Sequence, residues 1–119
     1  DRGGQIRVPE WRPTSLTPDI RALIEKLPLP VGPQVDPDWG DKTLTPQERV
    51  YGWNSFAVLA MESGVPAAPV NAIAGKAHAT CQLRFVTGTD AGDILPALRR
   101  HLDSEGFDKV RIDPEESGF

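Results

Sequence analysis

The chain has few of the side chains that hydrolytic or metal chemistry needs. It contains two histidines, His78 and His101, and one cysteine, Cys81, with no His-x-x-x-His or Cys-x-x-Cys spacing. A structural zinc ion usually takes four protein ligands and a catalytic one three, so the sequence predicts no metal site in this chain. Neither a Gly-x-Ser-x-Gly nor a Gly-x-x-x-x-Gly-Lys motif is present, which excludes the usual elbow serine and phosphate loop.

The histidines and the cysteine have plain structural interpretations. His78 falls on the polar face of an alternating segment, so we expect it at the surface rather than as a ligand. His101 lies near the end of an amphipathic segment, where an imidazole suits the negative pole of a helix. Cys81 lies in the apolar row between Ala79 and Leu83, which favours core packing over service as a thiolate nucleophile.

Acidic and aromatic side chains gather in the first half of the chain. Asp36, Asp38 and Asp41 could bind calcium, but a proline and a tryptophan between them break the spacing of an EF-hand loop. The pattern therefore favours a solvated acidic loop. The three tryptophans are expected to fill gaps in irregular structure rather than to bind a ligand: Trp11, Trp39 and Trp53.

Arg84 is the side chain that stands out. It lies between Leu83 and Phe85 in the most regular alternation of the chain. An outward-facing arginine on a sheet usually meets solvent, but its guanidinium fork is also suited to recognising a carboxylate. Composition and spacing leave both interpretations open.

The second half of the chain has the periodicity of a sheet with one helix. We expect strands over 55–61, 76–86 and 108–113, and a helix from Asp93 to about Gly106. Asp93 is preferred to Asp90 as N-cap because Pro96 then takes the third helical position, where no backbone hydrogen bond is lost. This order predicts an α+β fold: a ferredoxin-like two-layer sandwich, with helices on one face of an antiparallel sheet, that lacks its first strand and helix.

The first half is rich in proline and should be irregular. Ten of the twelve prolines lie in residues 1–69. Thr17-Pro18 and Thr45-Pro46 are typical helix starts, and they predict short helices over 17–27 and 45–52 with a loop over 31–44. We therefore interpret 1–119 as a single domain, composed of a proline-rich insertion (1–54) and a strand-strand-helix-strand unit (55–113).

Composition excludes several classes of protein. The length of 119 residues suits one domain, and a net charge of −4 argues against nucleic-acid binding. No apolar run approaches the length of a membrane span, and we expect no signal peptide. The chain begins at Asp1 rather than Met, so we expect it to be a piece of something larger.

The segment PVNAIAGKAHATCQLRFV at 69–86 resembles a pattern of the zinc-dependent aminoacylases and dipeptidases, metallopeptidase family M twenty. That pattern is Asn/Thr-x-Ile-Pro followed by a strand ending in Arg-x-Val. GQIRVPEW at 4–11 resembles the family's Gly-x-Ile-x-Val-Pro-Gly-Phe segment. Residues 87–102 resemble its Pro-Gly-x-Asp and helix, and 109–112 its last lid strand, so the resemblance covers about 4–113. Ala74 departs from the pattern, because it replaces the proline after the isoleucine.

The resemblance implies that the chain is part of the lid, or dimerisation, domain of a cytoplasmic hydrolase. The parent would hold two zinc ions in a separate catalytic domain of the same protein, cleave dipeptides or N-acyl amino acids, and form a homodimer. This chain would bind no metal and be inactive alone. Arg84 matches the lid arginine that holds the substrate carboxylate, and Asn71 matches the residue that contacts the scissile bond, in many members from the neighbouring subunit.

Two other classes of function remain open from the residues themselves. One is a free-standing ferredoxin-like module that binds a ligand or regulates a partner. The other is a purely structural dimerisation unit. A module would have a native start and stop at residues 1 and 119, whereas a lid would be flanked by catalytic-domain sequence.

Overall fold

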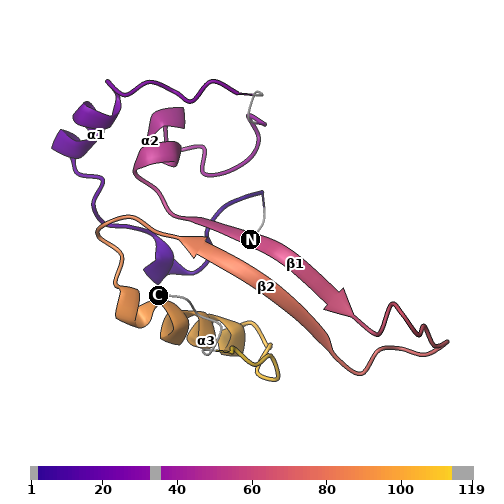
Figure 1. Ribbon diagram of the computed structural model, residues 1–119. Coiled ribbons are helices and arrows are strands. Elements are labelled where there is room, and N and C mark those ends of the chain that lie inside the picture. Colours follow the sequence, from indigo (N-terminus) through magenta and orange to yellow (C-terminus); the bar gives the residue numbers. More distant parts are fainter. Residues whose placement is uncertain (1–2, 33–35, 114–119) are drawn as a thin grey trace. The chain divides into compact units, whose positions relative to one another are not determined.

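The structure, a computed structural model, describes residues 3–32 and 36–113. Its elements follow in the order η1 (Pro9–Trp11), α1 (Pro18–Ile24), α2 (Pro46–Tyr51), β1 (Ser55–Ser63), β2 (Ala77–Arg84), η2 (Ala91–Asp93) and α3 (Ile94–Ser104). The strands β1 and β2 pair in an antiparallel two-stranded sheet (Figure 1). The chain is therefore a small α+β fold, as its periodicity predicts.

The chain divides by its internal contacts into two compact units. One comprises Asp1–Asn54 and Phe85–Phe119, and we call it the helical unit. The other is Ser55–Arg84, the hairpin unit. The expected division into an insertion over 1–54 and a unit over 55–113 stays a prediction.

The helix α1 begins as the sequence predicts and ends three residues early. The Oγ1 of Thr17 accepts the N–H of Ile20, and Pro18 occupies the first turn. After Ile24 the backbone changes to tighter turns, in which Lys26 donates to the carbonyl of Leu23 and Leu27 to that of Ile24. The proline at position 28 explains this ending, because it has no N–H to donate to the carbonyl of Ile24, which accepts from Leu27 instead.

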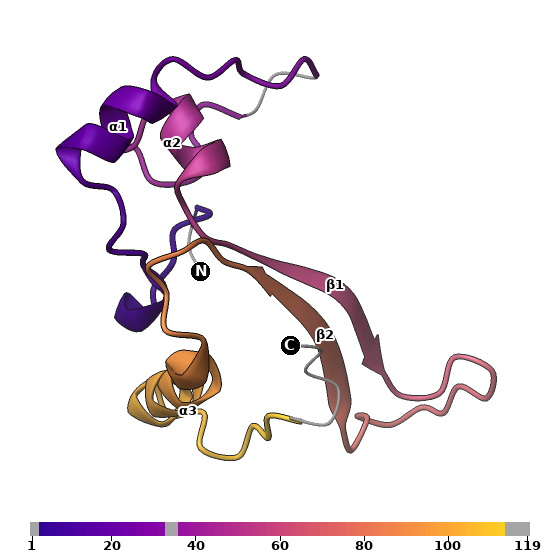
Figure 2. The same cartoon turned by 60° about the vertical axis from the view of Figure 1, so that its left-hand side comes forward.

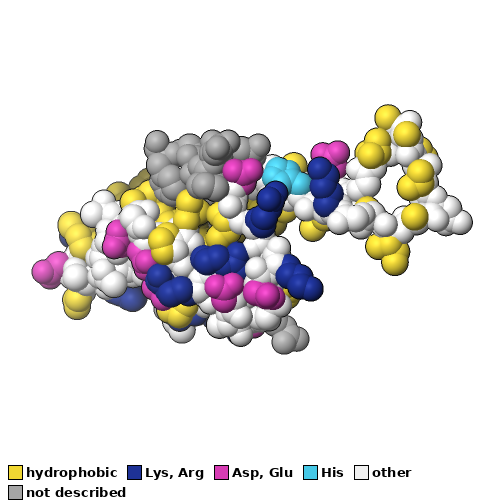
Figure 3. Space-filling model, turned by 90° about the horizontal axis from the view of Figure 1, so that it is seen from below, with side chains coloured by type: hydrophobic (Ala, Val, Ile, Leu, Met, Phe, Trp, Pro, Cys, Tyr) yellow, Lys and Arg dark blue, Asp and Glu magenta, His cyan; other side chains and the backbone are white. Residues whose placement is uncertain are grey.

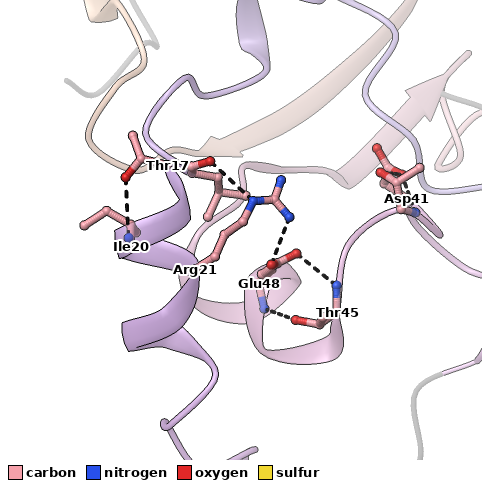
Figure 4. Close-up of polar contacts among 8 residues, drawn as sticks. Thr17, Ile20, Arg21, Asp41, Thr45 and Glu48 are labelled. Atoms are coloured by element: carbon pink, nitrogen blue, oxygen red, sulfur yellow. Dashed lines mark hydrogen bonds and ion pairs between the residues drawn. The ribbon is translucent and has the colours of Figure 1, made fainter.

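The helix α2 is fixed by a capping box and by an ion pair to α1. Thr45 Oγ1 accepts the N–H of Glu48, and the Glu48 carboxylate accepts the N–H of Thr45. The second carboxylate oxygen of Glu48 pairs with Arg21 Nη1 at 3.0 Å (Figure 4). Glu48 is buried, and each of its two carboxylate oxygens has a partner, the N–H of Thr45 or the guanidinium of Arg21, as a buried charge requires. Figure 2 shows α1 and α2 side by side.

The start of helix α3 agrees with the prediction made from the position of Pro96. Asp93 is the N-cap, although its side chain makes no capping hydrogen bond. Asp90 caps the preceding turn η2 instead, by accepting the N–H of Gly92. At the other end Gly106 has a φ of +84°, which lets Gly106 and Phe107 donate back to the last turn. Glycine adopts this conformation at little cost, and it ends the helix as predicted.

The C-terminal strand predicted over 108–113 is wrong. Asp108 and Lys109 form a turn, in which Val110 donates to the carbonyl of Phe107, and no residue of 108–113 belongs to a strand. The two terminal nitrogens of Arg99 donate to the carbonyl of Phe107, just before this segment, and to that of Val110 within it. A helix side chain and the turn thus engage backbone groups that a neighbouring strand would have used, and the alternation of Val110 and Ile112 does not reveal this.

Asn54 is the buried polar centre of the helical unit. It is 4% exposed, and its Nδ2 donates to the carbonyl of Trp11 at 2.7 Å and to Thr89 Oγ1 at 2.8 Å. Its Oδ1 accepts the N–H of Val86 at 2.8 Å. The Trp11 indole donates to the carbonyl of Ile94, the first residue of α3. The buried apolar side chains among the described residues all belong to this unit: Ile6, Val8, Trp11, Ile24, Leu44, Ile94 and Ala97.

The hairpin unit carries the two strands that the sequence predicts, and a β-bulge that it does not. The register is regular on either side of a shift between Val58 and Ala60, which leaves Leu59 as the extra residue. The bulge places Val58 opposite Cys81 and Met61 opposite Ala79, so both large side chains share the apolar face of β2. Without it, two residues three apart would face opposite ways.

The apolar face of the hairpin is exposed, which corrects the expectation for Cys81. That thiol lies at the surface, and so do Ala77 and Ala79; Leu83 is half-buried. The apolar and polar residues of β2 do lie on opposite faces of the strand, as their alternation predicts. Burial did not follow because the hairpin unit has no helix of its own to cover the apolar row.

We expect Asn54→Ala to lower the free energy of unfolding by about 2–4 kcal/mol, because the Trp11 carbonyl and the Val86 N–H lose their partner in a buried place. Urea unfolding of the two proteins would measure the difference. Asn71→Ala, in the exposed loop, is the matched control and should change stability by less than about 0.5 kcal/mol. Equal effects of the two substitutions would contradict a central role for Asn54.

Candidate carboxylate-binding site

Arg84 is the last residue of β2 and pairs with Ser55 across the hairpin. Its side chain is exposed, and its Nε donates to Oε1 of Gln82 at 3.1 Å. Its two terminal nitrogens make no hydrogen bond or ion pair with any residue that the structure describes. The guanidinium therefore has one edge free for a planar anion such as a carboxylate.

Asn71 lies at the other end of the hairpin. It is exposed in the loop 64–76 that joins β1 to β2, and this loop continues beyond the strands (Figure 1). The eight residues of β2 separate the loop from Arg84, a span of roughly 23 Å at about 3.3 Å per residue. One hairpin does not bring both predicted residues to one small substrate, so a shared site would need Asn71 from a second copy.

The polar face of the hairpin also carries Glu62 and His78, which lie directly opposite each other. With Ala60, Met61 and Thr80 they line a shallow hollow of about 330 Å³. His78 is exposed, as predicted, and His101 is half-buried in the last turn of α3. Within 3–32 and 36–113, no three or more His, Cys, Asp or Glu side chains form a group that could hold a metal ion.

Cys81 is a poor nucleophile in this setting. Although it lies at the surface, desolvation by the strand atoms around its sulfur raises the pKa of the thiol above its ordinary value. The thiolate is therefore scarce at neutral pH. The conclusion about its chemistry agrees with the expectation from sequence, but the reason is not a place in the core.

The aspartates around residue 40 are engaged in turns. Asp41 accepts the hydroxyl of Thr43 at 2.6 Å and its N–H at 2.9 Å, and these two hydrogen bonds hold the pKa of the Asp41 carboxyl below its ordinary value. Asp36 accepts the N–H of Asp38, which itself pairs with Lys42. The described part of this loop is solvated and acidic, as its spacing predicts.

The tryptophans do not share one role. Trp11 is buried and Trp53 is half-buried, which fits the expected gap filling. Trp39 is 55% exposed, so that expectation is wrong for it. Its indole lies against the backbone of Gly4, where an added Cβ would come within 2.4 Å of the ring nitrogen. Glycine at position 4 is therefore what lets the indole approach.

No helix in the described part of the chain is long and apolar enough to cross a membrane. A scan against protein-family models and searches of curated proteins and solved structures found no match for the chain. The evidence for the candidate site is therefore the geometry of the hairpin.

Thr43→Val should raise the pKa of Asp41 toward its ordinary value of 3.8, because the hydroxyl that stabilises the carboxylate is lost while the N–H still donates. A carboxyl-carbon NMR titration across the acidic range would measure the shift. Since the folded pKa is lowered, the stability contributed by Asp41 is present above pH 3.8 and is lost as the pH falls through the lowered pKa. Thr80→Val, on the hairpin, should leave the Asp41 titration unchanged.

Proposed function

We propose that this chain is part of the lid, or dimerisation, domain of a dinuclear-zinc dipeptidase or related amidohydrolase, where it binds the carboxylate of the substrate. The observation that supports the proposal is the exposed guanidinium of Arg84, whose terminal nitrogens are free among the described residues. Arg84 is on a strand, and a strand holds a binding group more accurately than a loop does.

The finer fold belongs to the same proposal. On it, β1 and β2 are neighbouring strands of a ferredoxin-like antiparallel sheet, and α3 is one of the helices on its face. The apolar row of the hairpin supports this, because such a row is the surface that a helical layer covers in an α+β sandwich. The remaining strands would come from outside the described residues, since 108–113 does not supply one.

On this proposal, metal chemistry and substrate binding belong to different domains, as the side chains of this chain indicate. No described group of residues suits a zinc pair, so the metal chemistry would belong to a catalytic domain elsewhere in the same cytoplasmic protein. Bound zinc would supply an activated water and polarise the scissile carbonyl. The lid would bind and orient a dipeptide or N-acyl amino acid, and the chain alone would not hydrolyse it.

A homodimer completes the site on this proposal. Arg84 and Asn71 lie at opposite ends of one hairpin, so a substrate that met both would lie between two copies. The hairpin unit has three charged residues besides His78, namely Glu62, Lys76 and Arg84, and most of its apolar side chains are exposed. Figure 3 shows the hydrophobic side chains around the loop that joins β1 to β2. Depletion of charge in a buried contact is typical of protein interfaces.

We expect Arg84→Ala in the protein that carries the catalytic domain to lower kcat/KM for dipeptides by about 10²-fold or more, because a charged contact to the substrate carboxylate is lost. Steady-state kinetics would measure the change. Lys76→Ala removes a cation from the same hairpin and is the matched control; it should leave kcat/KM within about threefold. Unchanged kinetics in Arg84→Ala would contradict the role of Arg84.

Copies of the chain should associate as concentration rises, and Met61→Lys should weaken this association by about tenfold or more. Met61 is 76% exposed on the apolar face of the hairpin, and a buried ammonium there would be costly. Sedimentation velocity over a range of concentrations would measure the equilibrium. Val31→Lys, at a fully exposed position in the helical unit, should have no effect. A monomer at every concentration would contradict the dimer.

A further inference from the structure

Gln82 and Arg84 form a pair on the polar face of the hairpin. They are two residues apart on β2, so their side chains project from the same face of the strand. The Nε–H of Arg84 donates to Oε1 of Gln82 at 3.1 Å. Because a guanidinium has donors and no acceptor, the amide atom that faces it must be the oxygen.

This contact determines which edge of the guanidinium is open. A guanidinium can bind a carboxylate through Nε with one terminal nitrogen, or through the two terminal nitrogens. Gln82 occupies the Nε–H, and thereby closes the first of these edges. The edge that remains is the pair Nη1 and Nη2, which is free among the described residues.

The side chain of Gln82 carries no charge, and this matters as much as its hydrogen bond to Arg84. A glutamate at this position would form a charged pair with Arg84 and offset the charge that a ligand carboxylate needs. The glutamine amide orients the guanidinium and leaves its full positive charge available. A ligand with a free carboxylate is then favoured over the same ligand with a neutral carboxamide.

We propose that Gln82 is the positioning residue of Arg84, which it holds so that the two terminal nitrogens bind a free carboxylate end-on and reject the carboxamide. This inference rests on the proposed carboxylate-binding function of Arg84 and adds a residue and a ligand class to it. Gln82 acts through Arg84, and therefore its effect must be visible on the Arg84 guanidinium itself.

The test uses this chain with N-acetylglycine as the carboxylate probe and N-acetylglycinamide as the neutral one. NMR titration gives the Kd of each probe, and the Nε–H resonance of Arg84, assigned with Arg84→Lys, reports on the contact with Gln82. Thr80→Val is the matched control, because residue 80 lies on the same face and makes no hydrogen bond with Arg84. Unchanged amide shifts over the hairpin establish that each variant keeps its fold.

Gln82→Leu should raise the Kd for N-acetylglycine by roughly three- to tenfold and shift the Nε–H resonance to that of a free arginine. Gln82→Glu should raise the Kd further, by about thirtyfold or more, because a carboxylate then competes for the guanidinium. Binding of the carboxamide should be negligible in every protein.

The outcomes separate the two proposals. If Arg84→Lys weakens N-acetylglycine binding while both Gln82 variants match Thr80→Val, the positioning role is overturned and the role of Arg84 stands. If Arg84→Lys leaves binding unchanged, carboxylate recognition by Arg84 fails, and the role of Gln82 fails with it. A Kd in Gln82→Glu no higher than in Gln82→Leu overturns the argument from neutrality.

Discussion

The helical unit depends on one side-chain amide. Asn54 comes immediately before β1, and the N–H that it accepts, that of Val86, comes two residues after β2. The same amide donates to the carbonyl of Trp11, whose indole in turn donates to the start of α3. Segments from both halves of the sequence thus meet at a group that is buried and fully hydrogen-bonded, and an unpaired donor or acceptor there would be costly.

The starts and ends of the helices follow from residues close by in the sequence. The features that the sequence did not predict depend on contacts between residues far apart in it. The Thr-Pro starts at 17 and 45, the position of Pro96 and the glycine at 106 each act within one helical turn, so the sequence alone was sufficient for them. The segment 108–113 is not a strand: it begins in a turn, and Arg99, on another element, donates to the carbonyl of Val110 within it. Asn54 was missed for the same reason: a lone asparagine before a strand gives no sign of partners at positions 11, 86 and 89.

The sequence was enough to single out Arg84 as a candidate carboxylate-binding residue, but not to show which residue orients its guanidinium. Regular alternation placed Arg84 on the polar face of β2, and the structure has it there with its terminal nitrogens free among the described residues. The strand predicted over 76–86 already implied that Asn71 lies far from Arg84, because distance along a strand grows with every residue. The sequence could not show the contact of Arg84 with Gln82, which depends on the rotamers of two long side chains.

The bulge in β1 has a consequence for how this strand can vary in length. Pairing before Leu59 and pairing after it are each regular, and Leu59 itself has no partner in the register. Loss of Leu59 would give an uninterrupted ladder in which every other residue keeps its partner and its side of the sheet. Loss of Val58 or of Ala60 would also restore a regular ladder, because Leu59 would then take the vacant place opposite Cys81 or Thr80. The bulge at 58–60 is thus the place where β1 can shorten by one residue while the rest of the strand keeps its partners.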